Sequence, residues 1–321
     1  MPSTLGESVD DRKTVLITGA GVGGIGGELA KEFHRKGYRV FATARRLETV
    51  IELEDAFGIE ILPLDVTCTA NIQSVRDEIA LRTGGRLDVL VNNAGYSRIA
   101  AATDLEIDTV VKDMFETNLF GVMRMVQEFV ALLIAAEGGG TIVNVGSIAG
   151  VMPYVFGSAY GASKAALHSY ADCLRVELAP FGVKVITVIT GGISSNIARH
   201  SIASSFLPST SLYLPIISHF RARAGNSQVN AQSATDYARA VVRQVMKPDW
   251  RKPLWYWRGH FAKMAWFVST FLWKGAFDYG MKKKFGLLEM RKKWLLTERE
   301  RKKGEGEEGG SRVEVKKIKG Y

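Results

Sequence analysis

The fold of this chain is decided by residues 14–26, TVLITGAGVGGIG. The first five residues form a continuous apolar run of the kind expected of a strand buried on both faces. A glycine-rich turn follows, and a helical pattern then runs through Leu29 and Phe33 until Gly37. Such a turn allows close backbone approach to a pyrophosphate, which faces the N-terminus of the helix. The segment therefore predicts a dinucleotide-binding unit, although the glycines alone would also fit a plain turn.

Further apolar runs alternate with helical patterns along the chain. The runs expected to form buried strands are Tyr38–Ala44, Ile59–Val66, Asp88–Val91, Thr141–Val145 and Gly182–Ile189. Helical patterns and short connections separate them, which indicates parallel strands joined by crossover helices. We therefore predict an α/β fold with a Rossmann-type, doubly wound parallel sheet.

The end of the second expected strand carries two arginines, Arg45 and Arg46. Enzymes that select NAD place a carboxylate here to bind the ribose 2′-hydroxyl, whereas an arginine suits the 2′-phosphate of NADP. No acidic residue occupies this strand end, so the sequence predicts NADPH/NADP+ as the cofactor. Arg46 fits a solvated arginine at a helix start equally well.

Tyr160 and Lys164 lie four residues apart, so on a helix their side chains share one face. A neighbouring ammonium favours the phenolate and lowers a tyrosine pKa from ~10 toward neutrality. A tyrosine in that environment can serve as a general acid or base. Ser147 lies 13 residues upstream of Tyr160, just after an expected strand. The spacing alone also occurs in helices without catalytic function, so its meaning depends on the other motifs.

The long helical pattern from Ile107 to Ala136 contains Asn118 near its middle. An asparagine on an apolar helical face is costly unless it is paired. Two interpretations follow: a satisfied core amide, which the periodicity alone favours, or a polar group positioned toward a site.

Five motifs in order carry a family resemblance: Thr18-Gly19 with Gly24-Ile25-Gly26, Asn92-Asn93-Ala94-Gly95, Asn118, Ser147, and Tyr160 with Lys164. Over residues 12–247 the chain resembles the short-chain dehydrogenase/reductase superfamily. The resemblance implies one Rossmann domain with about seven parallel strands. It also implies catalytic roles. Tyr160 donates a proton to a carbonyl, Lys164 lowers the tyrosine pKa and holds the nicotinamide ribose, Ser147 bonds the substrate oxygen, and Asn118 positions a water.

The same resemblance implies a set of residues that contact NADPH around the strand ends. They are Gly19, Gly24, Ile25, Gly26, Arg45, Asp65, Val66, Asn92, Ala94, Gly95, Tyr160, Lys164, Ile193 and Ser195. Two departures from the family pattern, the four residues Ala20–Gly23 in the glycine turn and Thr190-Gly191-Gly192 after the last expected strand, resemble the fungal NADPH-dependent 1-acyldihydroxyacetone-phosphate reductases. The branch also contains fungal reductases with undefined substrates.

Beyond the expected domain, residues 254–273 carry four of the six tryptophans. The uninterrupted apolar part, Met264–Trp273, is about half of the ~20 residues that a spanning helix needs. Lys263, Thr270 and Lys274 fall on one helical face, and basic clusters follow at 282–284 and 291–293. The pattern favours a helix in a membrane interface over the alternatives of packing on the domain or forming an oligomer interface.

Charge is distributed unevenly. Residues 281–321 contain 14 Lys and Arg against 7 Asp and Glu, whereas the rest of the chain is close to neutral. No base-stacking or groove-reading motif accompanies the basic tail, so nucleic acid is not an expected partner. The five histidines show no metal-ligand spacing, and we assign no metal site. Two distant cysteines and a polar N-terminus without a signal-peptide pattern fit a reducing, cytosol-facing location.

We therefore expect a flexible N-terminus (1–11), a Rossmann domain (12–250) with an apolar substrate lid at about 192–232, an aromatic and basic membrane-associating segment (251–296), and a disordered charged tail (297–321). The expected function is NADPH-dependent reduction of a lipid-like ketone, 1-acyldihydroxyacetone phosphate above all, at the cytosolic face of the endoplasmic reticulum or a lipid droplet. Alternatives are a steroid, retinoid or secondary-metabolite reductase, a cytoplasmic location, and a non-catalytic NADPH-binding scaffold on lipid. Homo-oligomer formation stays open.

Overall fold

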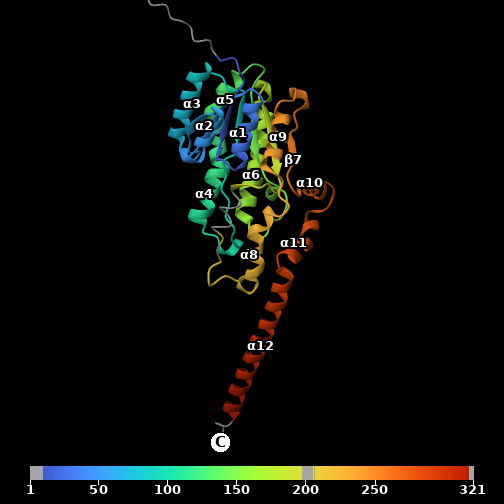
Figure 1. The fold of residues 1–321 in the computed structure, drawn as a ribbon. Helices are drawn as coiled ribbons and strands as arrows, with labels where there is room; N and C mark the ends of the chain where they lie inside the picture. Colours follow the sequence, from blue (N-terminus) through green and yellow to red (C-terminus); the bar gives the residue numbers. More distant parts are fainter. Residues whose placement is uncertain (1–9, 197–204, 206, 318–321) are drawn as a thin grey trace, which may run out of the picture.

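The described part of the chain contains one parallel sheet, which runs through the centre of the molecule (Figure 1). The computed structural model describes residues 10–196, 205 and 207–317. The seven strands have the order β3-β2-β1-β4-β5-β6-β7, and every neighbouring pair is parallel. The predicted doubly wound α/β fold is confirmed. The strands are β1 (Thr14–Thr18), β2 (Arg39–Ala44), β3 (Glu60–Pro63), β4 (Val89–Asn92), β5 (Thr141–Val145), β6 (Lys184–Thr190) and β7 (Trp255–Arg258).

Helices cover both faces of the sheet because its central strands are apolar on both sides. Val15 and Ile17 of β1 belong to a core with α1, α2 and α9, whereas Leu16 belongs to the opposite core with α3, α5 and α6. The α-helices of these layers are α1 (Ile25–Arg35), α2 (Ile51–Phe57), α3 (Thr69–Thr83), α5 (Gly121–Ile134), α6 (Ser158–Leu178) and α9 (Ala234–Val245). The 3-10 helices are η1 (Leu47–Thr49), η2 (Ala102–Asp104), η5 (Ile148–Gly150), η6 (Ala179–Phe181), η7 (Leu214–Ile216), η8 (Asn226–Gln228), η9 (Asp249–Arg251) and η10 (Lys274–Phe277).

The long helical run predicted for 107–136 contains two π-helical segments. It consists of η3 (Ile107–Val111), α4 (Lys112–Phe115), η4 (Glu116–Phe120) and then α5. Among the described residues, this run is the one helix long and apolar enough to cross a membrane. Its apolar side chains instead pack against the sheet, Met125 and Phe129 being fully buried there. It is therefore a core helix of the domain.

The predicted domain boundary at residue 250 is wrong. Residues 255–258, expected in the membrane-associating segment, form the seventh strand, and β7 pairs with β6 from Thr187 to Thr190. The Trp255 indole nitrogen donates a hydrogen bond to Asp172 of α6, at 3.0 Å. A four-residue run of three aromatic residues and an arginine has neither the length nor the alternation that marks a strand in a sequence, which explains the error.

The segment after β7 consists of helices. They are α10 (Ala262–Phe271), α11 (Asp278–Lys284) and α12 (Leu287–Lys317). Helix α12 starts beside η7, where Lys293 donates to the Pro215 carbonyl oxygen at 2.6 Å, and then projects away from the domain (Figure 1). Helix α12 includes residues 297–317, and the disorder predicted there from the sequence stays a prediction. Lys, Arg and Glu favour helix, and pairs such as Arg301 with Glu298 add to it.

The apolar lid expected over the segment 192–232 stays a prediction. Its residues 197–204 and 206 lie outside the described residues. In the described part, Leu207, Ile216 and Phe220 pack into a small core with Ile99 and Phe156. Phe220 lies on helix α8 (Ile217–Gly225), and Ile216 directly precedes that helix. These apolar side chains therefore hold the segment onto the domain.

We expect truncation after residue 253 to destabilise the whole domain, because it removes β7 and exposes the edge of β6. Truncation after Lys302 removes only a projecting stretch of α12 and should leave the melting temperature within about 2 °C of the full chain. Thermal unfolding followed by circular dichroism compares the two proteins. Equal melting temperatures for both truncations would contradict the role assigned to β7.

Candidate active site

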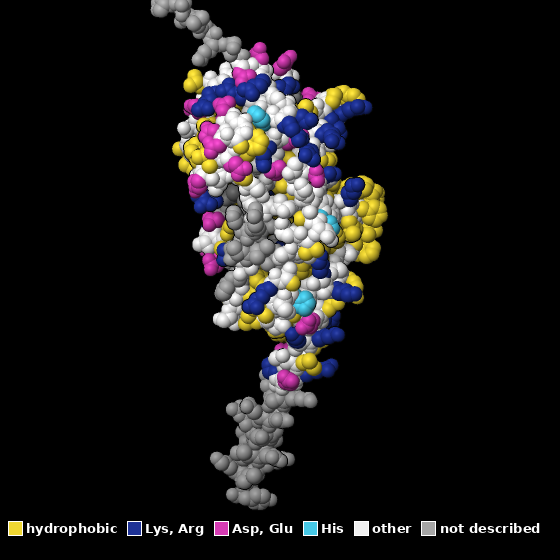
Figure 2. Space-filling model, in the orientation of Figure 1, with side chains coloured by type: hydrophobic (Ala, Val, Ile, Leu, Met, Phe, Trp, Pro, Cys, Tyr) yellow, Lys and Arg dark blue, Asp and Glu magenta, His cyan; other side chains and the backbone are white. Residues whose placement is uncertain are grey.

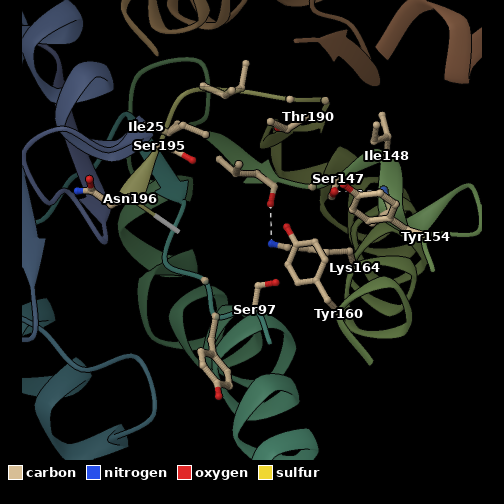
Figure 3. Close-up of a pocket in the computed structure, with 18 of the residues that line it drawn as sticks. Ile25, Ser97, Ser147, Ile148, Tyr154, Tyr160, Lys164, Thr190, Ser195 and Asn196 are labelled. Carbon is tan, nitrogen blue, oxygen red and sulfur yellow. Dashed lines mark hydrogen bonds between the residues drawn. The ribbon is translucent and has the colours of Figure 1, made fainter. Parts of the chain in front are cut away.

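A cavity of about 1310 Å³ lies at the carboxyl edge of the sheet. It is lined by residues that follow β1 to β6, as expected for a ligand site in an open parallel sheet. Ordinary small-molecule pockets hold roughly 300–1,000 Å³, so this one has room for a dinucleotide together with a second molecule. Figure 3 shows Ser147, Tyr160 and Lys164 together on one side of it.

Tyr160 and Lys164 both project from α6, as the spacing predicts. The Lys164 ammonium donates a hydrogen bond to the Val145 carbonyl oxygen at the end of β5, at 2.8 Å (Figure 3). The same nitrogen lies 6.0 Å from the centroid of the Tyr160 ring. Lys164 is 4% exposed. The first turns of α6 are thereby tied to the end of β5, with the phenol and the ammonium in one corner of the cavity.

Ser147 leaves the end of β5 and caps η5. Its hydroxyl oxygen accepts a hydrogen bond from the Ala149 N–H at 3.1 Å. Its own backbone N–H donates to Nε2 of His168 at 3.2 Å. Ser147 lines the cavity beside Tyr160, and a hydrogen bond between the two opposes the rise of the Tyr160 pKa. The serine is thus held from both sides and can bind a carbonyl oxygen between itself and the phenol.

The pKa of Tyr160 differs from the sequence prediction. Burial raises it above its ordinary value, the hydrogen bond from Ser147 opposes this, and Tyr154 raises it further. Burial also lowers the pKa of Lys164 to about 8. The expected lowering of the Tyr160 pKa by Lys164 is therefore not found in the protein alone, where desolvation is the larger effect. At neutral pH the phenol carries its proton, which is the form that a ketone reduction requires.

Asn118 lies in the π-helical segment η4 and does not line the cavity. Its side chain accepts from the Tyr96 N–H at 2.8 Å, donates to the Tyr96 carbonyl oxygen at 2.9 Å, and donates to the Ser163 hydroxyl at 2.9 Å. Ser163 in turn donates to the Tyr160 carbonyl oxygen at 2.8 Å. The amide thus joins the loop after β4 to α6, directly under the tyrosine. This contact set positions Tyr160, and the catalytic role predicted for Asn118 stays a prediction.

The glycine turn has the shape that a pyrophosphate requires. Gly19 has φ +66°, and a Cβ there would lie 2.9 Å from the Ala94 Cα. A Cβ at Gly26 would collide with the Gly19 carbonyl oxygen and the Asn93 amide. The N-terminus of α1, capped at Gly24 without a side-chain partner, therefore comes close to the cavity. The residues present fit a dinucleotide phosphate at this turn.

Most of the residues predicted to contact NADPH line the cavity, and two do not. The lining members are Gly19, Gly24, Ile25, Arg45, Asp65, Val66, Ala94, Gly95, Tyr160, Lys164, Ile193 and Ser195. Gly26 is buried inside the turn, and Asn92 is buried below it, where it donates to the Asn144 side-chain oxygen at 2.9 Å. Both support the lining of the cavity from beneath, and their predicted contacts with NADPH stay predictions.

Sequence reasoning assigns no site role to Tyr154, His168 or Arg223, although Arg223, like Arg221 and Arg98, is a candidate for a phosphate contact. Tyr154 and Arg223 line the cavity, and the Arg223 guanidinium lies 3.8 Å from the centroid of the Tyr154 ring. His168 lies behind Ser147 and stacks on Trp255 at 5.3 Å between centroids. His168 is on α6, two turns after Tyr160, and so faces the same side of the helix. That spacing was the available signal for His168, whereas nothing local distinguished Arg223 from Arg221.

The apolar wall of the cavity comes from the C-terminal segment rather than from the expected lid. Met264 and Val268 of α10, Leu272, Phe277 of η10 and Phe285 face it. The outer side of the same segment is also apolar. Figure 2 shows hydrophobic side chains gathered where Figure 1 labels α10. The exposed members include Trp266, Phe267, Phe271 and Trp273.

A doubly wound sheet, a glycine turn at a helix N-terminus and a serine–tyrosine–lysine corner define a dinucleotide-dependent oxidoreductase. The family model of the short chain dehydrogenases matches residues 13–204. The chain belongs to the short-chain dehydrogenase family, as the motifs predict.

Relatives match most of the chain. A short-chain dehydrogenase, virD, of Hypocrea virens is 40% identical and covers 89% of this chain and 97% of its own length. An NADPH-dependent 1-acyldihydroxyacetone phosphate reductase of Schizosaccharomyces pombe is 44% identical over 64% of this chain and 70% of its own. Among solved structures, the closed form of a serine dehydrogenase complexed with NADP+ has a TM-score of 0.65 and 27% identity, covering 77% of this chain and 94% of that one.

The buried His168 predicts an acid-sensitive fold. Burial, together with the Lys164 charge, lowers its pKa to about 3, far below the value of about 6.5 in an unfolded chain. The unfolded state therefore binds a proton first, so stability is complete above about pH 6.5 and falls as the pH drops toward 3. Between about pH 4 and 5.5, His168→Gln should lose stability less steeply than the wild type, by about 1.4 kcal/mol per pH unit.

Urea unfolding at several pH values measures this difference. His34→Gln, which removes a half-buried imidazole on α1, is the matched control and should keep the wild-type slope. Parallel curves for the wild type and His168→Gln would contradict a neutral histidine behind Ser147.

Proposed function

We propose that this protein reduces the ketone of a lipid-like substrate with NADPH, and that this substrate is 1-acyldihydroxyacetone phosphate, giving 1-acylglycerol 3-phosphate for glycerolipid synthesis. One observation carries the proposal: a single cavity joins the catalytic corner to an apolar wall built by the C-terminal segment. An acyl chain fits that wall while its ketone reaches Tyr160. The yeast relative named for this reaction, at 44% identity, supports the choice of substrate.

The chemistry of the chain's own residues follows from their placement. NADPH, when bound along the glycine turn, supplies the hydride for the carbonyl carbon. Ser147 donates a hydrogen bond to the substrate oxygen and orients it. Tyr160 donates its phenolic proton to that oxygen, and the Lys164 ammonium in the same corner stabilises the phenolate that remains. The buried setting strengthens these interactions because little water screens them.

NADPH as the cofactor is borne out by the relatives. The fission yeast reductase is named for NADPH, and the serine dehydrogenase structure contains NADP+. Arg45 lines the cavity at the end of β2, where the 2′-phosphate of NADP is expected. Arg46 lines it too but lies 3.6 Å from Glu48. We therefore assign the 2′-phosphate contact to Arg45.

A second candidate is the reduction of a neutral polycyclic ketone, such as a steroid, a retinoid or a secondary metabolite. The relatives that cover more of the chain than the yeast reductase have names that give no substrate. The apolar wall also suits such a molecule. The two candidates share the cofactor and the catalytic corner and differ only in what fills the rest of the cavity.

The function is tested by following NADPH oxidation with palmitoyl-dihydroxyacetone phosphate, with NADH and a steroid ketone in parallel. We expect turnover with NADPH and the lipid, and a kcat about 10²–10⁴-fold lower for Tyr160→Phe. Tyr170→Phe, which removes a phenol of α6 that does not line the cavity, is the control and should stay within about twofold of wild type.

Full activity of a folded Tyr160→Phe protein would overturn the mechanism. Turnover of the steroid ketone alone would favour the second candidate. If no ketone is reduced although NADPH still binds, the non-catalytic scaffold is favoured.

The same segment supports a membrane-surface location in this proposal. The exposed aromatic side chains of α10 lie next to Lys263 and Lys274, and Lys282–Lys284 follow in α11. Tryptophans at headgroup level and lysines near anionic lipid, each contributing about 1 kcal/mol, are what an interfacial helix uses. Because the inner side of the segment lines the cavity, a lipid substrate would pass from the bilayer surface into the site. We place the protein peripherally on the cytosolic face of the endoplasmic reticulum or on lipid droplets.

Co-sedimentation with phosphatidylcholine–phosphatidylserine vesicles tests the location. The triple variant Trp266→Ser, Phe267→Ser, Trp273→Ser should reduce the bound fraction at least about fivefold, because it removes exposed apolar area. A control triple variant at exposed apolar positions elsewhere, Ile51→Ser, Leu81→Ser, Val176→Ser, should bind as the wild type does. Equal sedimentation of both triple variants would contradict the proposed docking face.

A further inference from the structure

Arg223 is a buried cation in the cavity wall. The residue is 6% exposed, on α8, and it lines the cavity that holds Tyr160. Its guanidinium carbon lies 3.8 Å from the centroid of the Tyr154 ring, and its Nε donates to the Val155 carbonyl oxygen at 2.9 Å. Those two contacts hold the planar group in one orientation.

No carboxylate in the described part of the chain forms an ion pair with Arg223. Burial lowers its pKa, and the one neighbouring ionisable group that raises it is Tyr154. The guanidinium nevertheless stays charged at cellular pH. A buried charge without a partner is costly, so such groups are found with a counterion or at a site that receives one. Nε uses one of the five N–H donors of the guanidinium, and no acceptor among the described residues bonds the other four.

Polar side chains line the cavity together with Arg223. The Asn226 amide contacts the Tyr154 hydroxyl at 3.4 Å, and Gln228 lines the cavity nearby in the same η8 turn. Tyr154 also contacts Phe285 of the C-terminal segment, at 6.1 Å between centroids. Arg45, assigned to the cofactor phosphate, follows β2 and belongs to a different part of the wall. The cavity thus offers an apolar wall and a separate cationic point.

We propose that Arg223, stacked on Tyr154, binds an acidic group of the substrate and thereby selects anionic, lipid-like ketones over neutral ones. This inference rests on the proposed function, in which the ketone of the substrate is reduced at Tyr160. A guanidinium fork matches a phosphate or a carboxylate in two-point geometry. Both groups share this chemistry, and the test separates them.

The test measures binding of octyl phosphate, octanoate and octanol to the full-length protein saturated with NADP+, by isothermal titration calorimetry. We expect octyl phosphate to bind at least about tenfold more tightly than octanol, since a charge-assisted contact is added. Arg223→Gln should abolish that preference. Arg221→Gln, an exposed arginine on the same helix, should keep it. A higher affinity for octyl phosphate than for octanoate assigns a phosphate, and the reverse order assigns a carboxylate.

Arg223→Lys covers the case in which the glutamine variant does not fold, because it keeps the charge and loses the fork. It should bind octyl phosphate about three- to tenfold more weakly than the wild type. Binding of both octyl phosphate and octanoate to the wild type no tighter than that of octanol, or wild-type affinity in both Arg223 variants, would overturn the inference. Failure to reduce palmitoyl-dihydroxyacetone phosphate together with a retained, Arg223-dependent anion preference would instead overturn the proposed reaction and leave the anion site standing.

Discussion

The hydrogen bond from the Lys164 ammonium to the Val145 carbonyl oxygen is the contact on which the rest of the site depends. It ties the first turns of α6 to the end of the central strand β5. Tyr160 and Ser147 leave those two elements, so their separation is set by this bond. Because the ammonium is buried, it has few alternative partners, and the geometry is held without water. The glycine turn after β1 and the loop after β4 then complete the edge of the sheet around it.

A chain of contacts extends from this corner to the far edge of the sheet. His168 accepts from the Ser147 N–H and stacks on Trp255, and Trp255 belongs to β7. The seventh strand therefore supports the catalytic serine through one imidazole. It is also the point where the C-terminal segment starts. The same stretch of chain thus closes the sheet, supports the active site from behind and continues into the wall of the substrate cavity.

The strands β1 to β6 and the common corner of Ser147, Tyr160 and Lys164 could be predicted because their signals are local. A strand buried on both faces is a run of apolar residues, and Tyr160 with Lys164 is a helical spacing. The strand β7 could not be predicted, because its three aromatic residues and one arginine resemble an interfacial anchor. The buried position of Arg223 could not be predicted either, since it depends on how α8 packs against distant segments. The sign of the Tyr160 shift was missed because a neighbouring charge is visible in a sequence and desolvation is not.

The two faces of the C-terminal segment have a physical consequence for selectivity. Its inner face, with Met264 and Phe285, offers a substrate only apolar contact, which discriminates weakly between acyl chains and polycyclic ketones. A buried polar group discriminates between substrates far more strongly, because a substrate that lacks the matching group leaves it unpaired. Arg223 is the group of that kind on the substrate side. Under the proposed function, the apolar segment therefore governs the entry of a lipid, whereas the buried charge of Arg223 governs the choice among lipids.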